Sequence, residues 1–171
     1  MKALKIIGII IVVAFATILI IGFAVPFYEY ESSVQVNATP EKCWKVYNDV
    51  KLLNQWLPGF ESLTLKSGDS LTAGSMYEII INDGGERMVM NEKIVDVNAP
   101  TKITYELTND VLKSEFSFSF EGSSSTTIKS NYKITGNNVI WSAVLFLSKS
   151  YMTSSANGQL TSLKKLIEQQ P

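Results

Sequence analysis

The sequence has no histidine, one cysteine (Cys43) and one arginine (Arg87) among its 171 residues. Without histidine, Ser-His-Asp and Cys-His catalysis and the usual histidine-containing zinc sites are excluded. A lone cysteine excludes an intramolecular disulfide, and we interpret Cys43 as a small buried hydrophobic residue, because no histidine is present to activate its thiol. No paired-carboxylate, phosphate-binding or metal-ligand motif stands out, so we predict no catalytic residue, no metal and no cofactor.

Positive charge is also scarce. The chain carries 15 Lys and Arg against 16 Asp and Glu, and without Lys2 and Lys5 the balance is 13 against 16. The remaining lysines are scattered along the chain. Nucleic-acid binding needs a basic face that displaces counterions from phosphates, so we expect no nucleic-acid partner.

One long apolar run is present near the N-terminus. From Ile6 to Val25 there is no charged residue, and Thr17 is the only strongly polar one. A run of about 20 apolar residues is the length that a helix needs to cross a bilayer. Because the run is apolar on every face, a buried core helix of a soluble domain is a poor alternative. We therefore predict a transmembrane helix that contacts the membrane through residues 4–25.

The charges that flank this run predict its orientation. Lys2 and Lys5 precede it, which keeps the N-terminus in the cytoplasm and places the rest of the chain outside. A cleaved signal peptide, with Gly22-Phe23-Ala24 as its cleavage site, is the alternative, but the apolar run is longer than a signal sequence needs. We expect a single-pass cell-membrane protein with an anchor over 1–27 and one domain over 28–171.

The domain begins with helix signals and continues with strands. Thr39-Pro40 is an N-cap followed by proline at the first helical position, and a short second helix fits Val50–Trp56. Polar and apolar residues alternate along Leu112–Glu121, with Leu112, Ser114, Phe116, Phe118 and Phe120 on one face. We predict a first strand that starts near Tyr28 and ends at Val34–Val36, and further strands at 60–66, 75–81, 88–97, 103–108 and 126–135. Apolar spacing then predicts one long helix over Val139–Glu168, with a bend at Gly158.

Three segments carry a family resemblance: Ala38-Thr39-Pro40-Glu41-Lys42-Cys43-Trp44, Asn48-Asp49-Val50 and Gln55-Trp56-Leu57-Pro58-Gly59. Together with the order of elements and the closing helix Leu160–Glu168, they resemble the SRPBCC superfamily (the START-like or helix-grip fold), and specifically its polyketide cyclase/dehydrase-like branch. The resemblance implies an α+β fold, in which a curved antiparallel sheet wraps around a long C-terminal helix. It also implies an apolar cavity between the two, with Trp56 close to its mouth.

We therefore expect the domain to bind a hydrophobic small molecule or a lipid. The residues that we expect to line the site are apolar or aromatic and lie on the strands, on the second short helix and on the long helix: Trp56, Tyr77, Ile79, Met88, Met90, Tyr105, Phe116, Phe118, Tyr132, Val144 and Tyr151. Each of them also fits a role in a filled core.

Two other functions stay open at this point. One is a partner-binding envelope domain with a filled core, which an exposed apolar patch on Val139–Leu147 would favour. The other is a cyclase- or dehydratase-like enzyme, which would need a buried acid or base. We expect all four charged residues on the central strands to be solvated, which makes the enzyme the least favoured of the three: Glu78, Arg87, Glu92 and Asp96.

Overall fold

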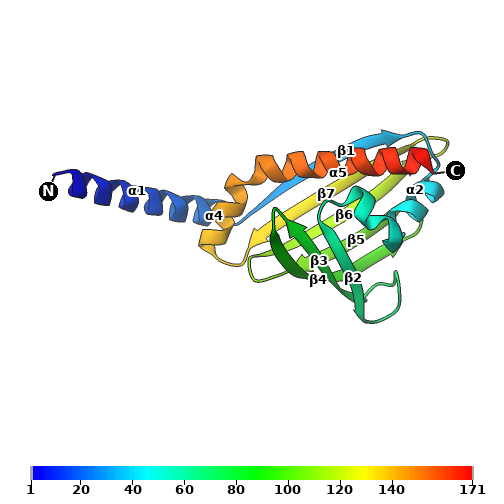
Figure 1. Ribbon diagram of the computed structural model, residues 1–171, viewed down its shortest axis with the longest axis horizontal. Helices are drawn as coiled ribbons and strands as arrows, with labels where there is room; N and C mark the ends of the chain where they lie inside the picture. Colours follow the sequence, from blue (N-terminus) through cyan, green and yellow to red (C-terminus); the bar gives the residue numbers. More distant parts are fainter. Residues whose placement is uncertain (1, 171) are drawn as a thin grey trace.

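The computed structural model describes residues 2–170 and has the predicted α+β architecture (Figure 1). A long helix α1 (Lys2–Ala24) leads into a seven-stranded sheet that is followed by two helices, α4 (Val139–Leu147) and α5 (Lys149–Gln169). The other elements are β1 (Phe27–Val36), α2 (Pro40–Tyr47), the 3-10 helix η1 (Val50–Leu52), α3 (Leu53–Trp56), β2 (Phe60–Ser67), β3 (Met76–Asp83), β4 (Glu86–Asn98), β5 (Lys102–Thr108), β6 (Leu112–Gly122) and β7 (Thr126–Gly136).

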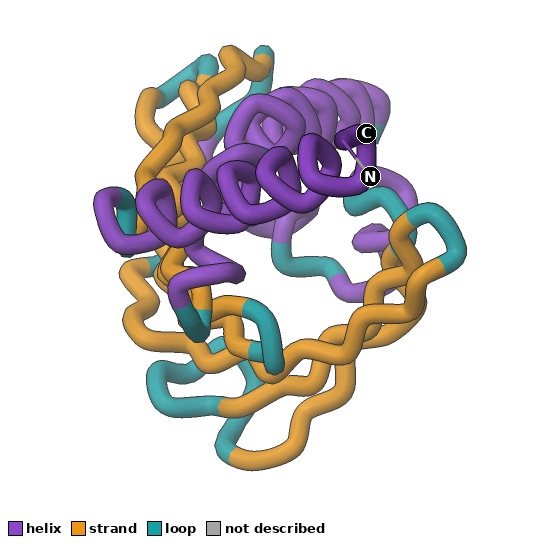
Figure 2. The backbone as a smooth tube through the Cα atoms, turned by 90° about the vertical axis from the view of Figure 1, so that its left-hand side faces the viewer, coloured by secondary structure: helices purple, strands orange, loops and turns teal. Residues whose placement is uncertain are grey.

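The sheet is antiparallel throughout, with the strand order β1-β7-β6-β5-β4-β3-β2. The first strand therefore pairs with the last one, and the remaining strands follow as a meander with short connections. Viewed from the α1 end, the strands form a curved wall and the helices lie along its open side (Figure 2). The helix-grip arrangement is thereby confirmed.

The two ends of the sheet carry different helices. At the capped end, where β1 ends and β7 begins, α2 starts with the predicted cap: Thr39 precedes Pro40, and its hydroxyl accepts a hydrogen bond from the Lys42 amide. Helix α2 packs on β6, with the Trp44 ring edge-on to Phe120 at a centroid distance of 5.7 Å. At the anchor end, where β1 begins and β7 ends, α1 and α4 meet.

The long C-terminal helix bends at Ser148, not at Gly158 as predicted. At the bend the Ser148 hydroxyl donates to the Val144 carbonyl over 2.9 Å, and the segment before it, α4, packs against α1. Gly158 lies inside the continuous helix α5, with open space where a Cβ would be. Because of the bend, only α5 lies over the sheet, while α4 packs against α1, β7 and β1.

Helix α1 projects away from the domain (Figure 1). Its segment Lys5–Ala24 is long and apolar enough to cross a membrane, and almost none of it is buried. Only its last turns contact the rest of the fold. There Gly22 approaches α4 so closely that a Cβ would collide with the backbone of Val139.

Candidate ligand-binding face

Four aromatic rings form a stacked row on the inner face of the sheet, the face turned toward α5. Tyr30, Tyr132, Phe116 and Tyr105 are register neighbours on β1, β7, β6 and β5. Successive rings are stacked, with centroid distances of 4.7, 5.8 and 4.9 Å. Tyr30, Tyr132 and Phe116 stay partly exposed, so the row offers a flat apolar surface that the protein's own side chains do not cover completely.

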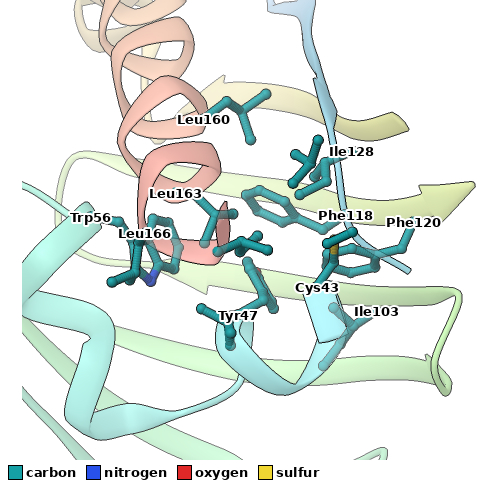
Figure 3. Close-up of a cluster of buried hydrophobic side chains, with 14 of the residues drawn as sticks. Cys43, Tyr47, Trp56, Ile103, Phe118, Phe120, Ile128, Leu160, Leu163 and Leu166 are labelled. Carbon is teal, nitrogen blue, oxygen red and sulfur yellow. The ribbon is translucent and has the colours of Figure 1, made fainter. Parts of the chain in front are cut away.

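Toward the capped end, the same face is tightly packed. Side chains from α2, α3, β5, β6, β7 and α5 meet there in one cluster (Figure 3). Its labelled members are Cys43, Tyr47, Trp56, Ile103, Phe118, Phe120, Ile128, Leu160, Leu163 and Leu166, and all of them are buried. The interpretation of Cys43 as a small buried hydrophobic residue is confirmed, and burial raises the pKa of its thiol.

Toward the anchor end, the inner face is more open. Several residues there are only partly buried, such as Met88 on β4, Leu107 on β5 and Leu63 on β2, although Tyr28 and Ile134 beside α4 are buried. The strand register places these positions beyond the aromatic row, on the side of Leu112 and Gly136. A ligand held on this face would therefore enter between the sheet and the first half of α5.

One carboxyl group lies on this apolar face. Glu92 alternates with buried Met90 and Ile94 along β4, so its side chain points to the inner face, and it is only 9% exposed. Its register partners are Tyr77 on β3 and Leu107 on β5. Burial raises the pKa of Glu92 to about 7, because the charged carboxylate is poorly solvated there. The expectation that Glu92 is solvated was wrong.

Two tyrosines connect Glu92 to the packed cluster. Tyr47 on α2 and Tyr105 on β5 are both buried in this cluster, and their side chains influence each other's pKa. Burial raises the pKa of both tyrosines, and the negative charge of Glu92 raises them further. Tyr47 in turn lies against Trp56, with ring centroids 5.5 Å apart. The polar groups of the inner face thus adjoin one another at the border between its packed and open parts.

Trp56 has a buried hydrogen-bond donor without an acceptor within residues 2–170. Its indole ring is 5% exposed, and its Nε1–H has no hydrogen-bond partner among the described residues. A buried donor without an acceptor costs about 1–3 kcal/mol, so a ligand that supplies an acceptor would gain from it. Trp56 lies within the packed cluster, not at a rim as the resemblance implied.

The structure brings together most of the residues expected to line a site. Nine of them lie on the inner face or in the adjoining cluster: Trp56, Tyr77, Ile79, Met88, Met90, Tyr105, Phe116, Phe118 and Tyr132. Val144 and Tyr151 do not join them. Both are exposed: Val144 lies on α4, which the bend at Ser148 turns away from the sheet, and Tyr151, 65% exposed, lies on the outward side of α5, where its neighbour Met152 packs inward.

Three residues of this face were missing from the sequence prediction: Tyr30, Tyr47 and Glu92. Glu92 lies on the same face of β4 as Met88 and Met90, so the alternation along this strand was the sequence signal that could have placed it on the inner face. Tyr30 alternates with Tyr28 along β1, a signal that could have placed it on the inner face, whereas Tyr47 belongs to α2, whose position over the sheet a single sequence does not show. The other charged residues of the central strands do lie outside: Glu78 pairs with Lys66 at 3.0 Å and Arg87 with Glu61 at 2.9 Å, while Asp96 is exposed.

Two hollows lie elsewhere on the surface. One of about 660 Å³ crosses the outer face of β1, β7, β6 and β5 and is lined mainly by polar residues such as Glu31, Lys102 and Asn131. Another of about 720 Å³ follows the bend between α4 and α5, beside Phe146 and Leu147. The first hollow also borders Tyr30, Phe116 and Tyr132 of the aromatic row, whereas the second contacts none of the residues expected to line the site. Among residues 2–170, no three Cys, Asp or Glu side chains gather closely enough to hold a metal ion.

The sequence model of the family "Polyketide cyclase / dehydrase and lipid transport" matches residues 28–168. No curated protein sequence matches the chain. The fold is similar to that of the aromatase/cyclase ZhuI from Streptomyces sp. R1128, with 14% identity, a TM-score of 0.69 and coverage of 83% of this chain and 94% of that one.

Two further solved structures share the fold. One is norcoclaurine synthase from Thalictrum flavum in complex with dopamine and hydroxybenzaldehyde, with 19% identity, a TM-score of 0.63 and coverage of 89% and 93% of the two chains. The other is the di-domain aromatase/cyclase BexL of the BE-7585A biosynthetic pathway, with 15% identity and a TM-score of 0.68. The match covers 85% of this chain but only 52% of BexL, about half of its length.

Proposed function

The chain belongs to the polyketide cyclase/dehydrase and lipid transport family, and from this membership we propose that it binds a hydrophobic small molecule or a lipid on the inner face of its sheet. We propose further that α1 anchors it in the cell membrane, with the domain outside. The observation that carries the binding proposal is the stacked row Tyr30–Tyr132–Phe116–Tyr105, in which every ring except the buried Tyr105 remains partly exposed beneath α5.

Burial of apolar surface supplies the binding energy. Each Å² of apolar surface removed from water contributes about 25 cal/mol before the costs of ordering. The flat row favours a planar or ring-containing ligand, because stacked aromatic contacts add to the area term. The Trp56 Nε1–H and the Glu92 carboxyl then favour a ligand that carries a hydrogen-bond acceptor as well as a donor such as a hydroxyl group.

The proposed anchor would keep the domain next to a source of such a ligand. A hydrophobic molecule partitions into the bilayer, and a domain tethered directly to the end of a transmembrane helix stays beside that reservoir. The two residues between α1 and β1 leave little slack between span and domain. The flanking charges, with Lys2 and Lys5 before the span, favour a cytoplasmic N-terminus.

Native mass spectrometry of the full chain extracted in detergent tests the binding proposal. We expect a bound small molecule that is not the detergent. Met88→Trp would fill the open part of the inner face and displace it, whereas Val89→Trp, one residue along on the exposed outer face, would leave it bound. A wild-type chain that carries nothing, or a ligand that survives both substitutions, would contradict the proposal.

A cyclase- or dehydratase-like enzyme is the second candidate, and Glu92 is the observation that favours it. A carboxyl group with a pKa of about 7 exchanges protons readily near neutral pH, as a general acid or base must. If the bound molecule loses the mass of one water during incubation with the wild type but not with Glu92→Gln, the protein is a dehydratase. An unchanged ligand mass in both chains favours the binding module.

A further inference from the structure

Helix α4 has an unusual surface for a helix on the outside of a domain. Its nine residues, VIWSAVLFL, contain a single polar residue, Ser142, and that residue is buried. The exposed side is entirely apolar and consists of Ile140, Trp141, Val144 and Leu147, of which Leu147 is 62% exposed. Exposed apolar patches of this kind on a soluble surface mark contacts with another molecule or with a membrane.

The opposite side of α4 is already occupied. Leu145 and Phe146 pack on Tyr28 and Ile134, at the anchor end of β1 and β7. The Ser142 hydroxyl donates to the Pro26 carbonyl over 3.5 Å, which ties α4 to the link between α1 and β1. The helix is therefore held in place, and its apolar side cannot turn inward to reach the core.

The contact with α1 fixes the depth of α4 relative to the proposed span. At 1.5 Å per residue, the 20 residues Lys5–Ala24 measure about 30 Å, the thickness of the hydrocarbon core. Gly22 contacts Val139, and Ile18, Leu19 and Ile21 are partly covered, whereas residues 5–17 of the same helix are exposed. Since α1 packs against α4, α4 lies beside roughly the last 10 Å of the span.

The segment that contains α4 has charged residues only at its two ends. None occurs between Lys133 and Lys149. The Lys133 ammonium group lies 4.5 Å from the centroid of the Phe27 ring, and that of Lys149 lies 5.9 Å from the Tyr28 ring. Lysines of this kind, with an aromatic ring beside them, are typical of the level of lipid headgroups, where the charge reaches water and phosphate.

We propose that α4 is a second membrane element: it lies in the bilayer leaflet where α1 ends, with Ile140, Trp141, Val144 and Leu147 against the acyl chains. The inference rests on the proposed anchor. A membrane fits this side better than a protein partner, because α4 adjoins the end of an apolar span and is bordered by lysines. The open end of the inner face is then held at the membrane surface, where a hydrophobic ligand enters directly from the lipid.

Tryptophan quenching by lipids tests this position. The full chain is placed in nanodiscs of phosphatidylcholine that carries bromine either near the headgroup end or near the tail end of its acyl chains. We expect Trp141 to be quenched more strongly by the shallow bromines, and Trp141→Phe to remove most of the quenching. The matched control, Trp44→Phe, should keep it, because Trp44 lies on α2 at the capped end (Figure 1).

Four outcomes would overturn the inference. Equal quenching in Trp141→Phe and the wild type would place Trp141 outside the lipid. Strong quenching of Trp141 by aqueous iodide would show the same. Cross-links between Leu147→Cys chains, without bromine quenching, would assign the face to a second copy of this chain. Loss of the chain from the nanodiscs would overturn both this inference and the proposed transmembrane span. These measurements need no bound ligand, so a negative result here can be told apart from a failure of the binding proposal, which native mass spectrometry would show as a chain without ligand.

Discussion

The inner face of the sheet differs between its two ends. At the capped end, α2 and the last turns of α5 close over it, and side chains such as Phe120, Ile128 and Leu163 are almost completely buried. At the anchor end, Phe116, Tyr132 and Met88 on the same face remain partly exposed. The two halves share strands, register and residue types, so the difference comes from the helices that cover them.

This difference separates stability from function. The capped end contains the close contacts on which folding depends, whereas the open end keeps apolar surface available at the cost of incomplete packing. Glu92 lies on the border between them, where burial is deep enough to disfavour its charge. The predictions below test this division, beginning with the largest expected effect.

Removing one aromatic ring from each half of the inner face should give the largest difference in stability between the two halves. Phe120→Ala should lower the free energy of unfolding by about 3–5 kcal/mol, because its cavity forms in a packed region. Phe116→Ala, four residues earlier on the same strand and face, should cost roughly half as much, since its ring is only partly buried. Urea unfolding followed by circular dichroism measures both. Equal losses would contradict the division into a packed and an open half.

Glu92→Gln should make the stability of the protein less dependent on pH. The pKa of Glu92 is raised in the folded state from an ordinary value of 4.5 to about 7, so the folded chain binds more protons between these values and the wild type loses stability as pH rises through them. The variant lacks this loss. Relative to the wild type it should gain about 3 kcal/mol between pH 4 and pH 8.

Urea unfolding at both pH values gives this difference directly. Glu86→Gln, at an exposed position on the same strand, is the matched control and should show no comparable gain. A relative stability of Glu92→Gln that stays flat with pH would place the carboxyl in contact with water and weaken its proposed role on the inner face.

A polar contact at the capped end should have an intermediate effect. The fully buried Thr126 hydroxyl donates to the Ala38 carbonyl over 2.6 Å and joins β7 to the loop before α2. Thr126→Val leaves that carbonyl without its partner, which should cost about 1–3 kcal/mol in urea unfolding. Thr127→Val, on the opposite face of the same strand, should change the stability by less than about 0.5 kcal/mol. Similar effects of the two substitutions would show that this bond does not hold the cap.

The sequence was sufficient to predict most of the architecture. The alternation in Leu112–Glu121 gave the correct inner face of β6, and the Thr39-Pro40 signal gave the start of α2. These signals are local, since each depends on a few neighbouring residues. The bend at Ser148 was not predictable in this way, because Gly158 is the weaker helix former while the packing of α4 on α1 decides where the helix turns.

The candidate site was predictable only in part, and Glu92 illustrates why. Along β4, strict alternation from Met88 and Met90 places Glu92 on the inner face. A register shift between Ile94 and Asp96 breaks that alternation, so that Val97 also packs toward the core while Val95 is exposed. If the alternation is counted from Val95 and Val97 instead, it places Glu92 on the outer face. The irregularity depends on pairing with β5, which a single sequence does not display.

The smallest effect concerns α5, which spans both ends of the sheet. Gly158 lies in the middle of this helix, and a Cβ added there would meet no atom within 4 Å. Gly158→Ala should therefore stabilise the folded chain by about 0.5–1 kcal/mol, because alanine loses less backbone freedom in a helix. Urea unfolding measures the gain in stability. Native mass spectrometry measures how fast the bound ligand exchanges in the variant and in the wild type. If the first half of α5 must move to admit ligand at the open end, exchange should slow in the stiffened helix while the capped end stays unchanged. An unchanged exchange rate, together with the expected gain in stability, would show that the ligand enters without bending α5 at this glycine.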